Sequence, residues 1–195
     1  MTGTTSAVDT NAVDTGTVPL LQVRGLSKSF GGVRAVAGLS FSLQAGELLA
    51  LIGPNGAGKS TCFGLVNGQL VPDAGEVRLD GARIDGRPPR KVWRLGVGRT
   101  FQVASTFGSL RAVENVQLAL LSHAGQALSP GAALAARHRD AALSLLARVG
   151  LAAQADRPAA VLAYGDVKRL ELAIALAHEP RLLLMDEPTA GMAPA

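Results

Sequence analysis

The fold of this 195-residue chain is decided by the stretch Gly53-Pro-Asn-Gly-Ala-Gly-Lys59-Ser60, in which two glycines separated by four residues are followed by lysine and serine. The apolar run before it, Glu47–Ile52, predicts a buried strand, and the apolar pattern after it predicts a helix over Lys59–Leu70. A loop between a strand and a helix N-terminus directs several backbone N–H groups and the positive end of the helix dipole at one anion. The stretch therefore predicts a site for the phosphates of a nucleoside triphosphate.

The residues of this stretch have separate expected tasks. Lys59 would supply a positive charge to the β- and γ-phosphates, and the Ser60 hydroxyl would bind Mg²⁺. The alternative is a glycine-rich turn that fits the pattern by accident. Lysine argues against it, because the chain has 23 glycines but its lysines are few, and one of them stands at the required place. The residues expected around the phosphates are Gly53, Asn55, Gly56, Gly58, Lys59, Ser60 and Thr61.

A second pair of polar residues follows another apolar run. Arg181–Met185 predicts a short strand of the kind buried in a parallel sheet, and Asp186 and Glu187 follow it directly. Open α/β sheets bind ligands at the carboxyl ends of their strands. Asp186 would hold Mg²⁺ through water, and Glu187 would activate an attacking water as a general base. The alternative is a pair of solvated charges that close a strand.

The remaining pattern predicts an α/β protein with a helical insertion. Strands are expected over Leu20–Val23, Val33–Leu43, Glu76–Asp80 and Val97–Gln102, and helices over Ala112–Ser122, Ala132–Val149 and Asp166–Ala177. Between Val103 and Ala160 alanine and leucine recur at helical spacing, which indicates a helical subdomain inserted into the α/β core. We expect His123, His138 and His178 on the surfaces of these helices.

Composition excludes several classes of protein. The polar, threonine-rich segment 1–18 has no basic residue, so we expect a disordered tail and not a secretion signal, and we place the chain in the cytosol. The net charge is +4, but the arginines are scattered along the sequence and only 4% of residues are aromatic, so we expect no nucleic-acid partner. A modest positive charge suits a nucleotide or an anionic membrane equally.

Cys62 is either a thiol with a lowered pKa at a helix N-terminus or an ordinary small helix residue.

Together the two motifs resemble the ATP-binding cassette (ABC) ATPase family, and three further stretches agree. Leu162-Ala-Tyr-Gly-Asp166 resembles the cassette signature, and Gln102 resembles the Q-loop glutamine that reaches Mg²⁺ and the attacking water. Phe30 stands at the aromatic position that stacks on adenine, with a core aromatic as the alternative. The resemblance implies a P-loop NTPase (RecA-like) core with a small antiparallel β subdomain. The cassette would span 19–195, with the helical subdomain at about 103–163.

This resemblance also implies a second cassette, identical or different, that faces the first. Each ATP would lie between the phosphate loop of one cassette and the signature residues of the other, here Ala163, Tyr164, Gly165 and Asp166. The signature lacks the usual serine, so backbone N–H groups around Gly165 would contact the γ-phosphate. Because the chain ends before the family's switch histidine, we expect a C-terminally truncated cassette. A nucleotide-binding module without hydrolysis is therefore an alternative.

Within the family, three stretches look most like the ATP-binding subunits of bacterial branched-chain amino acid importers: Gly98–Gln102, Leu162–Gly165 and Gly191–Pro194. Relatives that serve urea or short amides are similar. The resemblance implies an ATPase on the inner face of the cell membrane, bound to permease subunits and acting indirectly with a solute-binding protein. Val103–Leu110, with apolar Phe107, is the expected permease-docking groove. A soluble cassette in DNA repair or translation would need a coiled-coil insertion or a tandem cassette, and this sequence shows neither.

Overall fold

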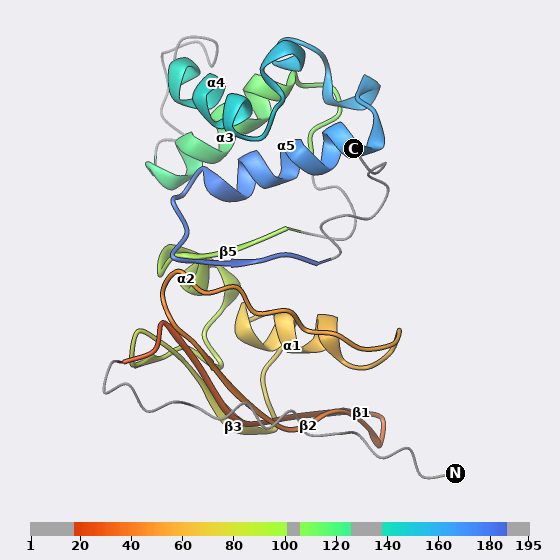
Figure 1. Ribbon diagram of the computed structural model, residues 1–195, viewed down its shortest axis with the longest axis vertical. Coiled ribbons are helices and arrows are strands. Elements are labelled where there is room, and N and C mark those ends of the chain that lie inside the picture. The colour runs from red at the N-terminus through yellow and green to blue at the C-terminus, as the bar shows by residue number, and fades with distance from the viewer. Residues whose placement is uncertain (1–17, 101–105, 126–137, 187–195) are drawn as a thin grey trace. The chain divides into compact units, whose positions relative to one another are not determined.

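A computed structural model describes residues 18–100, 106–125 and 138–186 of the chain (Figure 1). Its backbone divides into two compact units, residues 1–95 and residues 96–195. The first unit contains the phosphate-loop stretch, and the second contains Asp186. The two units are described separately below.

An antiparallel sheet of four strands forms most of the first unit. Its order is β2-β1-β3-β4, with β1 at Leu21–Phe30, β2 at Val33–Leu43, β3 at Ala74–Leu79 and β4 at Ala82–Arg83. Alternate residues point to opposite faces of a strand, and Leu21, Val23, Val77 and Leu79 are buried on one face. This sheet confirms the antiparallel β subdomain that the family resemblance implied.

Two helices accompany this sheet. α1, Lys59–Val66, lies over one face of the sheet (Figure 1) and buries Cys62, Leu65 and Val66. It ends earlier than the predicted Lys59–Leu70, because Gly68 takes a φ of +79° and the Leu70 N–H donates to the Gly64 carbonyl. The short helix α2, Pro89–Arg94, begins with proline at its first position and buries Val92.

The predicted buried strand over Glu47–Ile52 is wrong for this structure. The segment has no strand pairing, and Leu48 and Ile52 are 89% and 94% exposed. A strand satisfies its N–H and C=O groups only through a neighbouring strand. Among the described residues of the first unit, the strands belong to the antiparallel sheet, whose edges are β2 and β4. An apolar run shows that a segment is suited to burial, but it does not provide the neighbouring strand that burial requires.

Helices dominate the second unit. α3 (Ala112–His123), α4 (Arg139–Arg148) and α5 (Tyr164–Leu176) share one apolar core that includes Val116, Leu146 and Leu170. Two short strands, β5 (Val97–Arg99) and β6 (Leu182–Leu184), pair in parallel. Short 3-10 turns occur at Ala152–Gln154 and Ala159–Val161. α5 begins two residues before the predicted start. Within the described ranges no helix is long and apolar enough to cross a bilayer.

One of the three histidines differs from the prediction. His123 and His138 are exposed, as predicted, but His178 is buried against β5. A Cβ atom on Gly98 of β5 would come within 3.2 Å of the His178 ring, so glycine there makes room for the imidazole. Burial, and then His123 at 6.2 Å between ring centroids, lower the pKa of His178 below its usual value. The helical sequence pattern before His178 does not indicate that α5 ends at Leu176 and that the residues after it are buried.

A single buried side chain holds the loop before α3. Asn115 Oδ1 accepts from the Phe107 N–H at 2.8 Å, and Asn115 Nδ2 donates to the Phe107 carbonyl at 3.2 Å. The same amide group lies 3.4 Å from the Leu110 carbonyl and 3.0 Å from the Arg111 carbonyl. A buried amide with this many partners fixes the backbone path from residue 107 to residue 111.

Asn115→Ala should lower the free energy of unfolding by about 3 kcal/mol, because it leaves buried backbone groups without partners. Urea denaturation of the purified chain measures this. Ser122→Ala, on the exposed part of the same helix, is the control and should change the value by less than about 0.5 kcal/mol. Equal losses in the two variants would contradict the role of Asn115.

His178 should make the stability depend on pH. In the folded chain the pKa of His178 lies below the ordinary value of about 6.5. As the pH falls, the unfolded chain therefore binds more protons than the folded chain does. The stability that neutral His178 contributes is fully present above about pH 6.5, the pKa of an ordinary histidine. It is lost as the pH falls toward the pKa that His178 has in the folded chain. We expect the melting temperature to drop between about pH 7.5 and about pH 5.5. His178→Gln should flatten this dependence, whereas His138→Gln, at an exposed site, should leave it unchanged.

Candidate functional site

The loop of residues 53–58 leads directly into α1, and its glycines are structurally required. Gly56 and Gly58 have φ values of +83° and +82°, a left-handed conformation that strains other residues. Gly58 is also the N-cap of α1. A Cβ atom at Gly58 would overlap the carbonyl oxygen of Ala35 in β2. Only glycine therefore allows the start of α1 to lie so close to the sheet.

The N-terminus of α1 suits an anion. No side chain caps the helix, and its first turn contains no acidic residue. The first N–H groups of an α-helix have no acceptor within the helix, and the helix dipole is positive at that end. Asn55, Gly56 and Ser60 are exposed along the same stretch, and Thr61 is half-buried. The backbone N–H groups and the hydroxyl groups at this end could together hold an anion such as phosphate.

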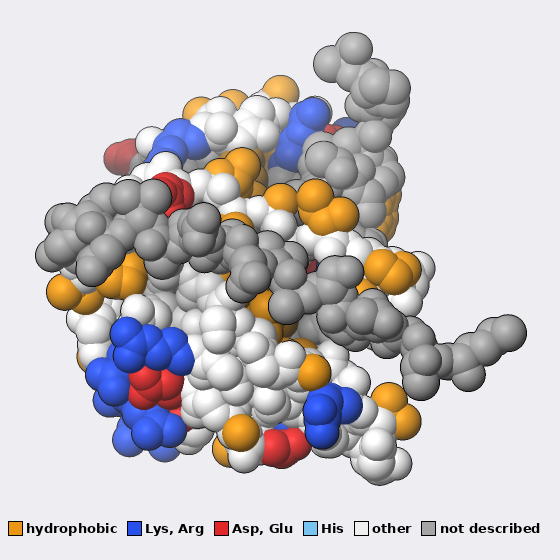
Figure 2. Space-filling model, turned by 60° about the horizontal axis from the view of Figure 1, so that its bottom comes forward, with side chains coloured by type: hydrophobic (Ala, Val, Ile, Leu, Met, Phe, Trp, Pro, Cys, Tyr) orange, Lys and Arg blue, Asp and Glu red, His pale blue; other side chains and the backbone are white. Residues whose placement is uncertain are grey.

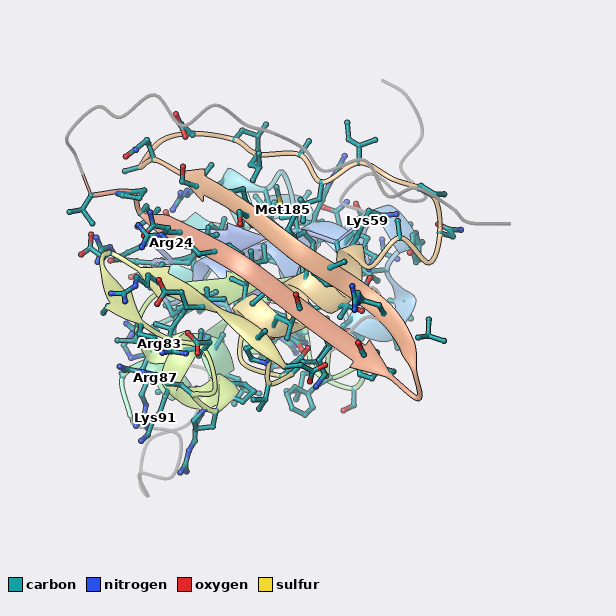
Figure 3. All side chains as sticks on the ribbon, turned by 90° about the horizontal axis from the view of Figure 1, so that it is seen from below. Arg24, Lys59, Arg83, Arg87, Lys91 and Met185 are labelled. Carbon is teal, nitrogen blue, oxygen red and sulfur yellow. The ribbon has the colours of Figure 1, made fainter. Side chains whose placement is uncertain are left out.

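Lys59 is folded over the loop. Its Nζ donates to the carbonyl of Gly53 at 2.6 Å and to that of Pro54 at 2.9 Å (Figure 3). The charge is thereby held above the loop and does not extend into solvent. An ammonium group has three N–H donors, so these two bonds leave one donor for a phosphate oxygen.

In the second unit, Asp186 follows the buried strand β6, as the sequence predicts. Its carboxylate lies 3.5 Å from a guanidinium nitrogen of Arg99, at the end of β5. The two side chains are only 10% and 11% exposed. Arg99 pairs with Leu184 in the parallel register, so the two charged residues meet at the carboxyl ends of neighbouring strands. Burial lowers the pKa of Arg99, and Asp186 opposes that shift by favouring the charged form.

Further polar groups surround Asp186. A cavity of about 50 Å³ lies between α5 and the ends of β5 and β6, and Met185 (Figure 3) forms part of its wall. Lys168 and Glu171, both nearly fully buried, form an ion pair of 3.0 Å on α5 beside this cavity. Buried charges of this kind require partners, and here the helix supplies both. The cavity is lined by Thr100, Lys168, Arg169, Glu171, Leu172, Met185 and Asp186.

Our sequence reasoning missed Arg99 and the ion pair on α5. The sequence placed Arg99 within the predicted strand Val97–Gln102, but only the structure ends that strand, β5, at Arg99 and so beside Asp186. Parallel neighbours place such ends together. No comparable signal marks Lys168 and Glu171, since charges three residues apart on a helix are usually solvated.

The signature residues lie at the start of α5. Ala163 is the N-cap, Tyr164 is exposed, and Gly165 is half-buried. The Asp166 carboxylate lies in the first turn, 3.6 Å from a nitrogen of Arg169. Lys168 Nζ lies 5.6 Å from the centroid of the Tyr164 ring. This helix N-terminus is accessible, and its single acidic residue is paired with a basic one.

Phe30 is the last residue of β1, and its side chain is 46% exposed. The alternative of a core aromatic is therefore wrong. The ammonium of Lys28 lies 5.7 Å from the ring centroid and also 2.7 Å from the Asp73 carboxylate. An exposed ring beside a fixed cation can offer a face to a planar base.

Cys62, in contrast, is buried within α1. Burial raises the pKa of its thiol to about 12. The alternative of a thiol with a lowered pKa is therefore wrong, because desolvation of the thiolate outweighs the helix dipole. The residue serves as a small apolar side chain of the core.

Several predicted site residues lie outside the described residues. These are Gln102, Glu187 and the segment Gly191–Pro194. The predicted docking segment Val103–Leu110 is described only from residue 106, and there Phe107 is 62% exposed.

Known proteins resemble this chain closely. Residues 36–190 match the model of the ABC transporter family. The high-affinity branched-chain amino acid transport ATP-binding protein BraF of Pseudomonas aeruginosa is 40% identical, over 90% of this chain and 72% of that protein. The ribose import ATP-binding protein RbsA 1 of Streptomyces coelicolor is 39% identical, over 94% of this chain and 35% of that protein.

Solved structures agree. An ATP-binding cassette of an ABC transporter superimposes with a TM-score of 0.80 at 30% identity, over 91% of this chain and 72% of that one. This likeness confirms the P-loop NTPase fold class, and the family match covers both the phosphate loop and Asp186. The chain therefore belongs to the ABC transporter family, as one of its ATP-binding cassettes.

Proposed function

We propose that this chain is the subunit that binds and hydrolyses ATP to power an importer of branched-chain amino acids. Members of its family are ATPases coupled to transport. The observation that carries the proposal is the geometry of residues 53–60, where Gly58 brings an uncapped helix N-terminus against β2 and Lys59 lies over the loop. A cradle of backbone N–H groups with one lysine is what a triphosphate requires.

The cargo is supported by similarity alone. BraF carries branched-chain amino acid transport in its name, and this chain covers 72% of that protein. The ribose importer subunit is almost equally identical, but this chain covers only 35% of it. A sugar importer is therefore the second candidate, beside the urea or amide importers that the sequence itself resembles.

Around the nucleotide, the chain's residues would divide the work. Phe30 would stack on the adenine, Lys59 would contact the β- and γ-phosphates, and Ser60, Gln102 and Asp186 would hold Mg²⁺, Asp186 through water. The ion, when bound, would neutralise phosphate charge. Among the described residues no group of three metal-ligating side chains occurs.

Arg99 would position Asp186. The ion pair keeps the carboxylate at the end of β6 and compensates its charge. Thr100 strengthens the same arrangement, because its N–H donates to the Leu184 carbonyl at 3.0 Å. We infer that this fixed carboxylate reduces the rearrangement that nucleotide binding requires.

Hydrolysis would need residues from two cassettes. Glu187 would act as the general base toward a water that Gln102 helps to orient. The signature residues Ala163–Asp166 of a second cassette would close over the γ-phosphate and exclude other water. In this arrangement the pairing of Asp166 with Arg169 would reduce the repulsion between a carboxylate and the phosphate.

Transport would couple through the loop at Phe107. Asn115 holds the backbone of this exposed aromatic, whose ring would offer an apolar contact to a permease subunit on the inner face of the membrane. A solute-binding protein would act indirectly, through the permease. We assign residues 19–195 to the cassette, with the helical subdomain at about 103–163. The tail predicted at 1–18 lies, except for residue 18, outside the described residues.

Lys59→Ala should weaken ATP binding about tenfold to a hundredfold, because it removes a charge-assisted hydrogen bond to phosphate. Isothermal titration calorimetry with ATP and magnesium measures the affinity. Lys91→Ala removes an exposed lysine elsewhere in the same unit and should leave the affinity unchanged. Unaltered binding after the Lys59 change would refute the proposed site.

Glu187→Gln should preserve ATP affinity and lower the hydrolysis rate by about a hundredfold or more, because the amide cannot accept a proton. Phosphate release by the purified chain with its permease subunits gives the rate. Glu179→Gln, a change at an exposed residue, is the matched control and should hydrolyse normally. Normal turnover in the Glu187 variant would assign the general base to another group.

A further inference from the structure

Basic residues are unevenly distributed along the chain. Between Asp85 and Glu114 the sequence contains six Lys or Arg residues and no acidic residue. Four of the six, Arg87, Arg90, Lys91 and Arg94, belong to the first unit and are exposed. Although the arginines look scattered in the sequence, the fold brings several of them together.

The sheet contributes the first part of this basic surface. Arg24 lies opposite Glu76 in the β1–β3 pair, and Arg78 lies opposite Arg83 in the β3–β4 pair. Paired residues and residues two apart share a face, so these side chains lie on the face away from buried Val77. Glu76 accepts from Arg78 at 2.9 Å and lies 3.5 Å from Arg24, while Asp85 lies 2.9 Å from Arg83. The carboxylates of Glu76 and Asp85 thus form ion pairs with three arginines.

α2 contributes the second part. Arg90, Lys91 and Arg94 fall within about 100° of arc around the helix, on the side away from the buried Val92. Neither they nor Arg87 form a salt bridge with a carboxylate of the described residues. Lys91 and Arg94 lie in the last turn of α2, where the negative end of the helix dipole stabilises their positive charges. Arg87 and Arg90 precede that end, so the dipole does not explain them.

Together these residues form one positively charged surface, called here the basic face: Arg24, Arg78, Arg83, Arg87, Arg90, Lys91 and Arg94. In Figure 3 the labelled Arg24, Arg83, Arg87 and Lys91 follow one another along one side of the unit, while Lys59 lies away from them. Figure 2 shows basic side chains gathered around a few acidic ones. The basic face is therefore separate from the phosphate loop.

We propose that the basic face binds the anionic headgroups of a phospholipid membrane. The choice of a membrane rests on the proposed function, which places the chain beside permease subunits at the inner face. That surface is negatively charged and attracts clustered Lys and Arg side chains. A single-stranded nucleic acid would need exposed aromatic rings for stacking. The basic face contains no aromatic residue, and Trp93 of α2 is half-buried.

The test is sedimentation of the 195-residue chain with lipid vesicles. The chain should bind vesicles of equal parts phosphatidylcholine and phosphatidylglycerol and should not bind pure phosphatidylcholine. Raising the salt from about 0.1 M to about 0.5 M should release it, because salt screens such contacts. The triple variant R90Q/K91Q/R94Q should lower the partition coefficient about a hundredfold, since each basic residue contributes roughly a fivefold factor.

Two matched variants sharpen the result. R34Q/R148Q/R157Q removes the same charge from exposed positions outside the basic face and should bind the anionic vesicles normally. R90K/R94K should also bind normally, because a lipid surface responds to charge and does not require the fork of arginine. Failure of R90K/R94K to bind would indicate a partner that needs arginine geometry and would overturn the lipid assignment.

Other outcomes would also overturn the proposal. These are equal binding to pure phosphatidylcholine, equal loss in R34Q/R148Q/R157Q, or tighter binding of a single-stranded RNA oligonucleotide that R90Q/K91Q/R94Q abolishes. ATP affinity, measured on the same samples, keeps the two proposals apart. R90Q/K91Q/R94Q should bind ATP normally, since it leaves residues 53–60 intact. A chain that binds anionic vesicles but no ATP would refute the proposed function alone.

Discussion

The close approach of two backbones at Gly58 is the constraint on which the first unit depends. α1 begins with its N-cap against the Ala35 carbonyl of β2, a distance that no side chain would permit. This contact sets where the helix begins and therefore where its N–H groups converge. The same glycine has a left-handed φ, so a single residue satisfies both the turn and the packing. The place where these N–H groups converge follows from how α1 is attached to the sheet.

In the second unit the governing requirement is that buried charges must be compensated. Arg99 and Asp186 meet because two parallel strands end side by side, and Lys168 and Glu171 pair on the adjoining helix. Removing either partner would leave an isolated charge in a poorly solvated place. The Arg99 guanidinium thereby holds the carboxylate at the edge of the sheet. Nucleotide chemistry also requires charged groups that are held rigidly in place.

Particular elements show where sequence reasoning succeeds and fails. The hairpin of β1 and β2 was predicted in part: Val33–Leu43 was expected as a strand and matches β2, but β1 runs to Phe30, beyond the predicted Leu20–Val23. The segment Glu47–Ile52 reads as a strand but lies exposed, because its pattern cannot supply a neighbouring strand. His178 follows a helical pattern yet is buried against β5. In both cases the deciding contact comes from residues distant in sequence.

The sequence by itself determined the family, the glycine loop that leads into α1 and the place of Asp186 after a short buried strand. Each of these depends on residue types at short, fixed spacing. Only the tertiary structure decided that Arg99 compensates Asp186 and that Asn115 holds the Phe107 loop. It alone gathers the basic face from β1, β3, β4 and α2. Charge and hydrogen bonding act over a few ångströms in space, and neighbours in space are set by strand register and helix packing.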